Sequence, residues 1–431
     1  MFAPATAPGR AAIAIVRMSG PLAGPSLAAL VGELPPPRRA RHTRLRDPDS
    51  GAAIDDGLAL WFPAPHSVTG EDVAELHVHG SRAVIAALIE VLQRRALRLA
   101  EPGEFTRRAF FNDKLDLVQA EAIADLTAAE TDAQRRQALR QLDGELGAIY
   151  RGWSARLLRV LAHLEAAIDF PDEDLPPTIE AEVARETGAL ATEIGVHLAD
   201  GRRGERLRDG ITIAIIGPPN AGKSSLLNKL AQREAAITSP IAGTTRDVIE
   251  IAIDLGGYPV VLADTAGLHE SADRVEQEGL RRALARAEAA ELRLFVFDAH
   301  RPEGAEGAAA WPSRDTLLVA NKIDLGGRSA LPPGALAVSA LTGAGLDTLI
   351  ATLTERVDAN YDIAAPLLSR ARHRAALEEA RDALHRGRAA PLPELKAEDL
   401  RLAWRSLGRI TGSVDVEDLL DVIFADFCIG K

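Results

Sequence analysis

The segment GPPNAGKS, from Gly217 to Ser224, constrains the fold of this chain more than any other stretch. It fits the pattern G-x-x-x-x-G-K-[ST] and lies between an apolar strand pattern, ITIAII, and a helical pattern, SSLLNKLA. Glycines at this spacing let backbone N–H groups surround a phosphate at a helix N-terminus, where the partial positive charge is greatest. The segment therefore predicts a nucleotide-binding loop, in which Lys223 reaches the β- and γ-phosphates and Ser224 binds Mg²⁺.

The rest of the chain predicts a multidomain architecture that combines α/β and all-α parts. Residues 1–113 mix short strand patterns with turns and a helical run, which indicates an N-terminal α/β domain. Residues 114–209 are mainly helical, and the apolar spacing from Leu139 to Ile168 predicts one amphipathic helix that Pro171 ends. Residues 210–356 alternate strands and helices, which is typical of a doubly wound parallel sheet. Because helices resume over residues 357–431, we expect a helical domain interrupted by an inserted nucleotide-binding domain.

Charge and composition exclude several classes of protein. The net charge of −12 argues against a protein that coats nucleic acid non-specifically, because such binding needs concentrated cations. The basic clusters at residues 38–46 and 202–208 are interpreted as solvated faces or linkers. The apolar runs are too short to span a membrane, and no N-terminal leader pattern is present. We therefore expect a protein of the cytoplasm.

The single cysteine, Cys428, lies in the terminal stretch FCIGK. Its position fourth from the end matches a prenylation box, but Gly430 is not aliphatic and Lys431 is not a usual terminal residue of that box. The residues alone leave two interpretations open, a packing role in a core and a reactive thiol.

Three further motifs follow the loop in the order that a guanine-nucleotide fold requires. DTAG, Asp264 to Gly267, ends the strand pattern PVVLAD, where the aspartate can hold Mg²⁺ through water. NKID ends the pattern TLLVANK, and its Asp324 can accept two hydrogen bonds from the guanine N1–H and exocyclic amine, which adenine does not offer. Ser339 and Ala340 follow the next strand pattern, ALAVS, and complete the base pocket.

Together these motifs resemble the translation-factor-related GTPases, so the expected nucleotide is GTP. The resemblance implies a Ras-like fold for the inserted domain and a second Mg²⁺ ligand, Thr245, in the stretch SPIAGTTRD. The expected GTP-binding residues are Asn220, Ala221, Gly222, Lys223, Ser224, Ser225, Ser239, Pro240, Ile241, Ala242, Gly243, Thr244, Thr245, Asp264, Thr265, Ala266, Gly267, Asn321, Lys322, Asp324, Ser339 and Ala340.

The residue after DTAG indicates how hydrolysis is assisted. Leu268 stands where Ras-like GTPases carry the glutamine that orients water, and leucine cannot orient water. Asn220 and the stretch GTTRD resemble GTPases that are activated by K⁺ and by dimerisation of their G domains. That resemblance implies that Glu276 orients the attacking water, and that the K⁺ ligands are Asn220 and the carbonyls of Ser239, Ile241 and Thr244.

The flanking segments PGRAAIAIVRMSG, TGEDVAELHVHG, PGEFTRRAFFNDKLDLVQAEAIADL, AAIDFPDED and FCIGK resemble the tRNA-modification GTPase MnmE (TrmE) family over essentially the whole chain. The family implies a folate-binding N-terminal domain that also mediates homodimerisation, and a G domain inserted into a helical domain. It also implies tRNA as substrate and the FAD-binding partner MnmG (GidA) in a heterotetramer. By this resemblance, the chain and MnmG together add an aminomethyl or carboxymethylaminomethyl group to C5 of the wobble uridine of the tRNA.

The same resemblance assigns a one-carbon donor, 5-formyl- or methylene-tetrahydrofolate. The family's folate contacts match Arg17, Glu75 and Lys114, with Lys431 near that site and Cys428 a candidate for the chemistry. A folate presents an anionic tail and a guanidine-like pterin edge, which need cations and a carboxylate respectively. Glu75, His77 and His79 alternate along one strand pattern, and ordinary polar exposure is preferred there over a metal site.

The alternative function is a ribosome-assembly or RNA-docking switch GTPase, since similar G domains occur in that class. An RNA-anchoring KH module with a GXXG loop would favour it, and no such pattern follows the G domain. Pro218 in the loop, His269 after DTAGL and a shortened N-terminal strand depart from the family pattern, but none of these residues is an expected phosphate or metal ligand.

Overall fold

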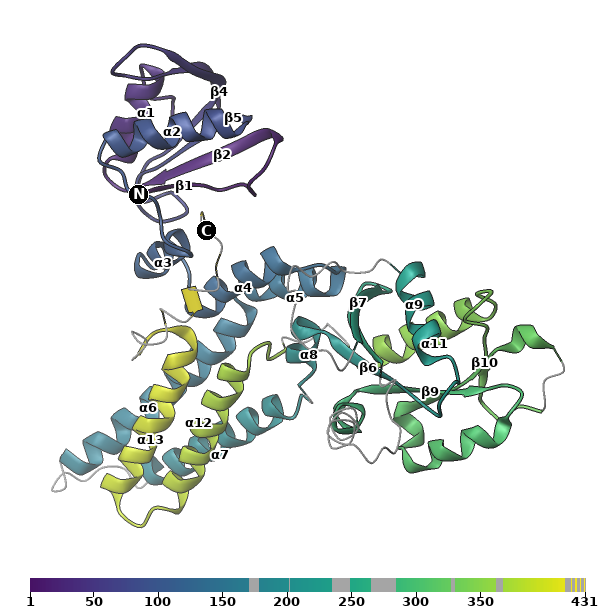
Figure 1. The fold of residues 1–431 in the computed structure, drawn as a ribbon. Helices are drawn as coiled ribbons and strands as arrows, with labels where there is room; N and C mark the ends of the chain where they lie inside the picture. Colours follow the sequence, from purple (N-terminus) through teal and green to yellow (C-terminus); the bar gives the residue numbers. More distant parts are fainter. Residues whose placement is uncertain are drawn as a thin grey trace, which may run out of the picture. The chain divides into compact units, whose positions relative to one another are not determined.

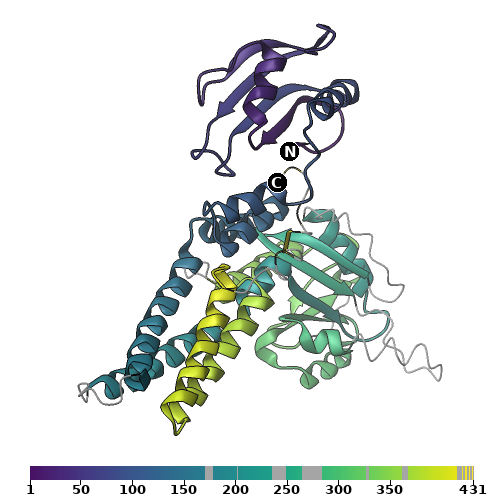
Figure 2. The same ribbon diagram turned by 90° about the vertical axis from the view of Figure 1, so that its left-hand side faces the viewer.

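The computed structural model describes residues 1–169, 178–200, 202–234, 249–264, 284–326, 330–361 and 367–414, and single residues near the C-terminus, namely Leu420, Ile423, Phe424, Phe427 and Gly430. The chain divides into two compact units. The first unit comprises residues 1–124, 141–190 and 382–431, and the second comprises residues 125–140 and 191–381. Figures 1 and 2 show an antiparallel sheet with helices in the first unit and a mainly parallel sheet with helices in the second, which confirms the predicted fold class.

The sheet of the first unit has the order β1-β2-β5-β4-β3, with antiparallel neighbours. Its strands are β1 (Phe2–Pro4), β2 (Ala11–Ser19), β3 (Arg41–Arg46), β4 (Ala53–Phe62) and β5 (Val73–Gly80). Along β5 the apolar Leu76 and Val78 are buried, while Glu75, His77 and His79, which alternate with them, are less buried. Helices α1 (Ala23–Val31) and α2 (Arg82–Arg94) pack on the apolar face (Figure 1). The alternation therefore leaves the polar residues of β5 on the face away from these helices.

Within the described residues, further helices lie before and after the segment that holds the second sheet. They are α3 (Glu104–Phe111), α4 (Leu117–Ala128), α5 (Asp132–Leu142), α6 (Glu145–Asp169), α7 (Thr178–Leu198), α12 (Ala371–Ala389) and α13 (Pro393–Thr411). Within the first unit α6 and α13 lie side by side, and Tyr150, Leu157 and Leu164 are among the buried residues of α6. The prediction of one helix from Leu139 to Ile168 is wrong, because the chain breaks at Gly144 with φ of +86°. The apolar spacing continues in phase across that break, which is why the sequence pattern hid it.

The sheet of the second unit has the order β11-β10-β9-β6-β8-β7, and every neighbouring pair except β7–β8 is parallel. Its strands are β6 (Ile211–Ile216), β7 (Ile249–Leu255), β8 (Tyr258–Asp264), β9 (Leu292–Asp298), β10 (Thr316–Asn321) and β11 (Leu336–Ala337). The helices are α8 (Arg203–Asp209), α9 (Lys223–Arg233) and α11 (Leu346–Asn360), with short 3-10 helices η1 (Pro302–Ala310), η2 (Ser313–Asp315) and η3 (Ile323–Leu325). Apolar cores cover both faces of this sheet, as expected for parallel strands.

No helix in the described ranges is both long and apolar enough to cross a membrane.

Candidate functional site

The loop between β6 and α9 is folded tightly against the neighbouring strands. Gly217 has φ of +135°, and a Cβ there would lie 2.0 Å from the carbonyl oxygen of Val296 on β9. Gly222 precedes α9 with φ of +89°, and a Cβ there would lie 2.4 Å from Nδ2 of Asn321. Both positions therefore require glycine, which turns the loop so that the N-terminus of α9 can face a phosphate.

Lys223 is held inside this loop. Its Nζ donates hydrogen bonds to the carbonyl oxygens of Gly217 and Pro218, both at 3.0 Å. Burial lowers the pKa of Lys223, and the negative charge of Asp264 partly offsets that effect. Asp264 ends β8 in register with Ile215 of β6, so strand pairing brings this carboxylate to the phosphate loop. A cation, a carboxylate and a helix N-terminus thus converge at one edge of the sheet.

Asn321, which ends β10, joins this loop to the predicted base pocket. Its buried side chain donates from Nδ2 to the carbonyl oxygen of Ala221 at 2.9 Å and accepts at Oδ1 from the N–H of Ala340 at 2.9 Å. The asparagine therefore fixes the phosphate loop relative to the loop that follows β11.

Asp324 is oriented by the same loop. The hydroxyl of Ser339, which is fully buried, donates to Oδ1 of Asp324 at 2.5 Å and accepts from the N–H of Thr342 at 3.0 Å. Asp324 is itself an exposed residue, so its other carboxylate oxygen, Oδ2, is available to a ligand. A planar base with two adjacent N–H groups can be received by such a fixed carboxylate.

Asp298 and His300 brace the NKID loop, and the sequence reasoning missed both. Asp298, the last residue of β9, accepts at Oδ2 from Nζ of Lys322 at 2.9 Å and at Oδ1 from the N–H of His300 at 2.9 Å. Nε2 of His300 contacts the carbonyl oxygen of Gly326 beyond the loop. Burial opposes ionisation of Asp298, but the bonds from Lys322 and His300 outweigh it and lower its pKa. The sequence feature that could have identified Asp298 is its position at the carboxyl end of a strand in this sheet.

Asn220 lies in the phosphate loop, and Ser224 and Ser225 lie in the first turn of α9. Other candidates for nucleotide and metal binding lie outside the described residues. They are Ser239, Pro240, Ile241, Ala242, Gly243, Thr244, Thr245, Thr265, Ala266, Gly267 and Glu276. The tail residues Cys428 and Lys431 also lie outside them. Gly430 between these two is described, and a Cβ there would lie 2.5 Å from the carbonyl oxygen of Pro4 on β1.

A second cluster of candidates lies on the polar face of the first sheet. Arg17 on β2 and Glu75 on β5 are paired in register, and Nε of Arg17 donates to Oε1 of Glu75 at 2.8 Å. Nε2 of His77 lies 3.3 Å from Oε2 of the same carboxylate, and the Arg17 guanidinium lies 5.8 Å from the ring centroid of Phe105. The structure thus brings Arg17 and Glu75 together. His79 instead pairs with Asp55 of β4 at 2.8 Å.

Lys114 follows α3, away from that strand pair in sequence, and its N–H donates to the carbonyl oxygen of Ala109 at 2.8 Å. A Cβ on Gly70 would lie 3.2 Å from Cε of Lys114, so the lysine stem packs on the loop before β5. Next to that loop, Oε2 of Glu71 accepts from Ser19 of β2 and from Arg108 of α3, both at 2.8 Å. These bonds tie α3, and the lysine after it, to the sheet.

Comparison with known proteins gives matches along the whole chain. The family described as "MnmE helical domain" matches residues 117–428, and the family "GTP-binding protein TrmE N-terminus" matches residues 1–114. A tRNA modification GTPase MnmE of Parvibaculum lavamentivorans is 58% identical over 441 residues, covering 100% of this chain and 99% of that protein. Proteins with the same description from Rhodospirillum rubrum and Gluconacetobacter diazotrophicus are 57% and 52% identical, covering 100% of this chain and 99% and 98% of their own lengths.

Among solved structures, the G domain of the T. maritima FeoB transporter is 24% identical, with a TM-score of 0.26, and covers 35% of this chain and 99% of that one. That superposition is too weak to support a conclusion. The sequence relatives do support one, because their identity extends over the full chain. The chain belongs to the family of tRNA modification GTPases MnmE.

Proposed function

We propose that this chain hydrolyses GTP and couples that reaction to modification of the wobble uridine of tRNA. The observation that carries the proposal is the pair of loops around Asn321 and Asp324, in which Asn321 bonds to the phosphate loop and to Ala340, and Ser339 holds the Asp324 carboxylate. Asp324 accepts the two guanine N–H groups and rejects adenine. Lys223 gives up its two carbonyl partners and binds the β- and γ-phosphates.

Mg²⁺ and K⁺ are part of this proposal, and the described donors suit both ions. The Ser224 hydroxyl in the first turn of α9 and the buried Asp264 carboxylate are oxygen donors of the kind that Mg²⁺ prefers. Asn220 has a left-handed φ of 58°, and no described residue makes a hydrogen bond to its side chain. We assign Thr245 as the second Mg²⁺ ligand, and the carbonyls of Ser239, Ile241 and Thr244 as K⁺ ligands. A bound K⁺ supplies positive charge beside the transferring phosphate, and Glu276 orients the attacking water.

The folate part of the proposal is supported by the Arg17–Glu75 pair. It offers a carboxylate and a guanidinium side by side on the polar face of the sheet, both partly exposed, which suits a pterin edge. Lys114 and Lys431 are assigned to the anionic tail. The position of Gly430 against Pro4 supports a C-terminal tail that reaches the N-terminal sheet with Cys428 and Lys431. On this basis the chain works in the cytoplasm as a homodimer with MnmG and its FAD, and uses a folate-borne one-carbon unit.

The domain boundaries that fit this function are an N-terminal folate-binding and dimerisation domain (1–113), a helical domain in two parts (114–209 and 357–431) and an inserted G domain (210–356).

Two measurements test the proposal. GTP turnover by the purified chain should fall steeply when Na⁺ replaces K⁺, because Na⁺ does not fit ligands spaced for K⁺; equal rates would refute the K⁺ assignment.

Mass spectrometry of tRNA from a deletion strain should show an unmodified wobble uridine. Unchanged modification would favour the alternative, a switch GTPase of ribosome assembly.

A further inference from the structure

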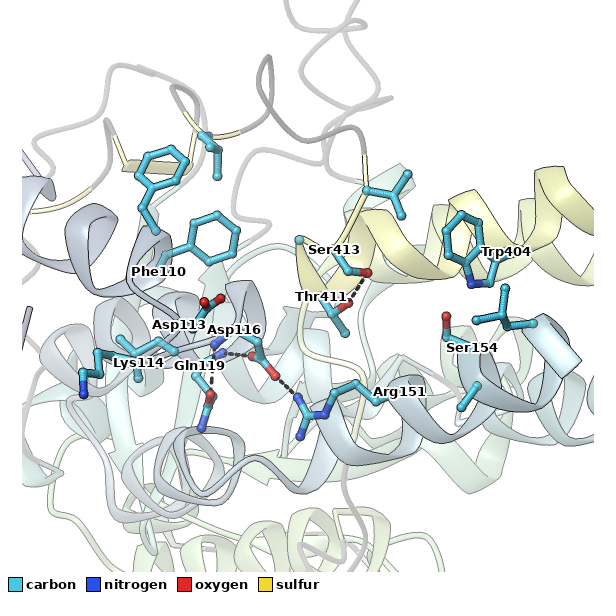
Figure 3. A pocket seen from close by; sticks show the side chains of 17 residues that line it. Phe110, Asp113, Lys114, Asp116, Gln119, Arg151, Ser154, Trp404, Thr411 and Ser413 are labelled. Carbon is cyan, nitrogen blue, oxygen red and sulfur yellow. Dashed lines mark hydrogen bonds and ion pairs between the residues drawn. The ribbon is translucent and has the colours of Figure 1, made fainter. Parts of the chain in front are cut away.

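A cavity of about 1250 Å³ opens in the first unit between the loop after α3 and helices α6 and α13 (Figure 3). It exceeds the roughly 300–1,000 Å³ of ordinary small-molecule pockets, so it has room for more than one small ring system. None of the residues that carry the nucleotide site lines it. Its wall touches the proposed folate site only through Lys114.

The polar floor of the cavity is built before any ligand arrives. Asp116, the residue before α4, makes a reciprocal cap with Gln119: its Oδ1 accepts from the N–H of Gln119 at 2.8 Å, and its N–H donates to Oε1 of Gln119 at 3.0 Å. Nε2 of Gln119 donates to the carbonyl oxygen of Leu142 at 2.9 Å, and Arg151 of α6 pairs with Asp116 (Figure 3). These bonds fix the loop, α4 and α6 relative to one another, so a ligand meets a preformed surface.

The rim of the cavity presents apolar side chains to solvent, two of which carry aromatic rings. Phe111 is 60% exposed and Leu158 is 52% exposed, while Trp404 on α13 is partly exposed. The guanidinium of Arg107 lies 5.8 Å from the ring centroid of Phe111. Exposed aromatic rings beside a cation are a stacking platform for planar bases.

The charges around the cavity also suit a nucleotide. Within the described residues Lys114 and Asp113 have no ion pair, so an ammonium and a carboxylate are available at the rim, and the pair Asp116–Arg151 is neutral in sum. Asp113 has a left-handed φ of 56°, which the end of α3 imposes. A lysine can contact a phosphate, and a carboxylate can accept from the N–H edge of a base.

Each of the two helices that wall the cavity has its arginines in an inner stretch without acidic residues, while its acidic residues lie nearer its ends. Between residues 146 and 164 of α6 and between residues 400 and 411 of α13 there is no aspartate or glutamate, and each stretch carries arginines. These are Arg151, Arg156, Arg159, Arg401, Arg405 and Arg409. Arg151, Arg156 and Arg401 already pair with Asp116, Glu186 and Glu165. The exposed Arg159 and Arg405 make no ion pair within the described residues, so they leave positive charge on these helices that can attract a phosphate.

We propose that this cavity binds unstacked nucleotides of the tRNA substrate, with bases stacked on Trp404 and Phe111 and phosphates near Lys114 and the arginines of α6 and α13. The inference rests on the proposed function, because that function supplies the RNA. Aromatic side chains can stack on bases that are unpaired, as in single-stranded loops, but not on bases within paired stems. The RNA segment that enters the cavity is therefore a loop.

The test uses the full chain and a fluorescently labelled RNA stem-loop with the sequence of a tRNA anticodon arm. Trp404→Ala should raise the Kd about tenfold, which corresponds to about 1.4 kcal/mol, within the range for a lost stacked base. Trp404→Phe, which keeps a ring, should bind nearly as the parent chain does. Trp311→Ala is the matched control, since Trp311 lies in the second unit beside Arg293.

A spectroscopic readout separates stacking from a merely structural role. RNA should quench the tryptophan fluorescence of the parent chain, and the quenching should be lost in Trp404→Phe although the RNA still binds. GTP turnover should be the same in all three variants, since none of these residues lies in the nucleotide site.

Three results would overturn the inference: an unchanged Kd in Trp404→Ala, quenching that persists in Trp404→Phe, or no binding of the stem-loop by the parent chain. The first would assign the cavity to another class of ligand, such as a protein segment. None of them decides the proposed function, which is tested separately by analysis of the wobble nucleoside in cells.

Discussion

Removing the hydroxyl of Ser339 is the sharpest test of how the base pocket is built. The hydroxyl is fully buried and makes two bonds, to Oδ1 of Asp324 at 2.5 Å and from the N–H of Thr342 at 3.0 Å. In Ser339→Ala the Asp324 carboxylate loses the donor that orients it and must be ordered by the incoming base. We therefore expect weaker binding of guanine nucleotides with little change in the fold.

The size of the effect follows from these two bonds. A hydrogen bond to a charged group contributes about 1.5–3 kcal/mol. The N–H of Thr342 adds little, because Thr342 is exposed and water can replace the hydroxyl. Since each 1.4 kcal/mol is a factor of about ten, the Kd for GDP should rise by about 10- to 100-fold.

The assay is equilibrium binding of a fluorescent GDP analogue, with thermal unfolding measured on the same samples. Ser406→Ala is the matched control, because Ser406 is also fully buried and its hydroxyl donates to the carbonyl oxygen of Leu402 at 2.9 Å, but it lies in α13. Its affinity for GDP should equal that of the parent chain. A Kd for Ser339→Ala within twofold of the parent value would refute the role assigned to this hydroxyl.

Other substitutions test the remaining parts of the two sites. Gly222→Ala should abolish GDP binding, because a Cβ would lie 2.4 Å from Asn321; Gly326→Ala, with a comparable φ of +73° and no atom within 4 Å, should retain it in the same assay. Arg17→Ala should weaken binding of 5-formyltetrahydrofolate at least about tenfold by calorimetry, and unchanged affinity would contradict the assignment. Burial opposes ionisation of Glu104, but hydrogen bonds from two arginines and a backbone N–H lower its pKa from 4.5 to about 2. Its contribution is thus present above pH 4.5 and lost toward pH 2, so the difference in unfolding free energy between the parent chain and Glu104→Gln should shrink over that range.

The second sheet was largely predictable, because parallel strands buried on both faces appear as continuous apolar runs and motifs follow their ends. The edge strand β7 was missed, although its isoleucines alternate with smaller or charged residues such as Glu250 and Asp254, which is typical of a half-buried strand. The basic run at residues 38–46 was interpreted as a solvated face or linker, but part of it forms edge strand β3, where Arg44 pairs with Asp56 at 2.8 Å. Residues 202–208, also interpreted as a face or linker, include most of α8.

Within the site, the residues of sequence motifs were identifiable and their supports were not. The brace joins Asp298 to Lys322 and His300 to Gly326, which lie 24 and 26 positions apart in sequence, and only the parallel pairing of β9 with β10 brings them together. The capping pair of Asp116 and Gln119 was visible in the sequence as an aspartate followed three residues later by glutamine, but the cavity beside it depends on α6 and α13. Long-range packing of this kind has no local signal.

The most direct test of the central claim is whether the nucleotide site drives tRNA modification in the cell. A deletion strain would be complemented with the parent chain, with Lys223→Ala, and with Lys229→Ala as a control on the same helix, α9, beyond the phosphate loop. The wobble nucleoside of its tRNA would then be quantified by mass spectrometry. We predict full modification with the parent chain and Lys229→Ala, and an unmodified uridine with Lys223→Ala. Full modification by Lys223→Ala, expressed at the parent level, would contradict the coupling of GTP hydrolysis to tRNA modification.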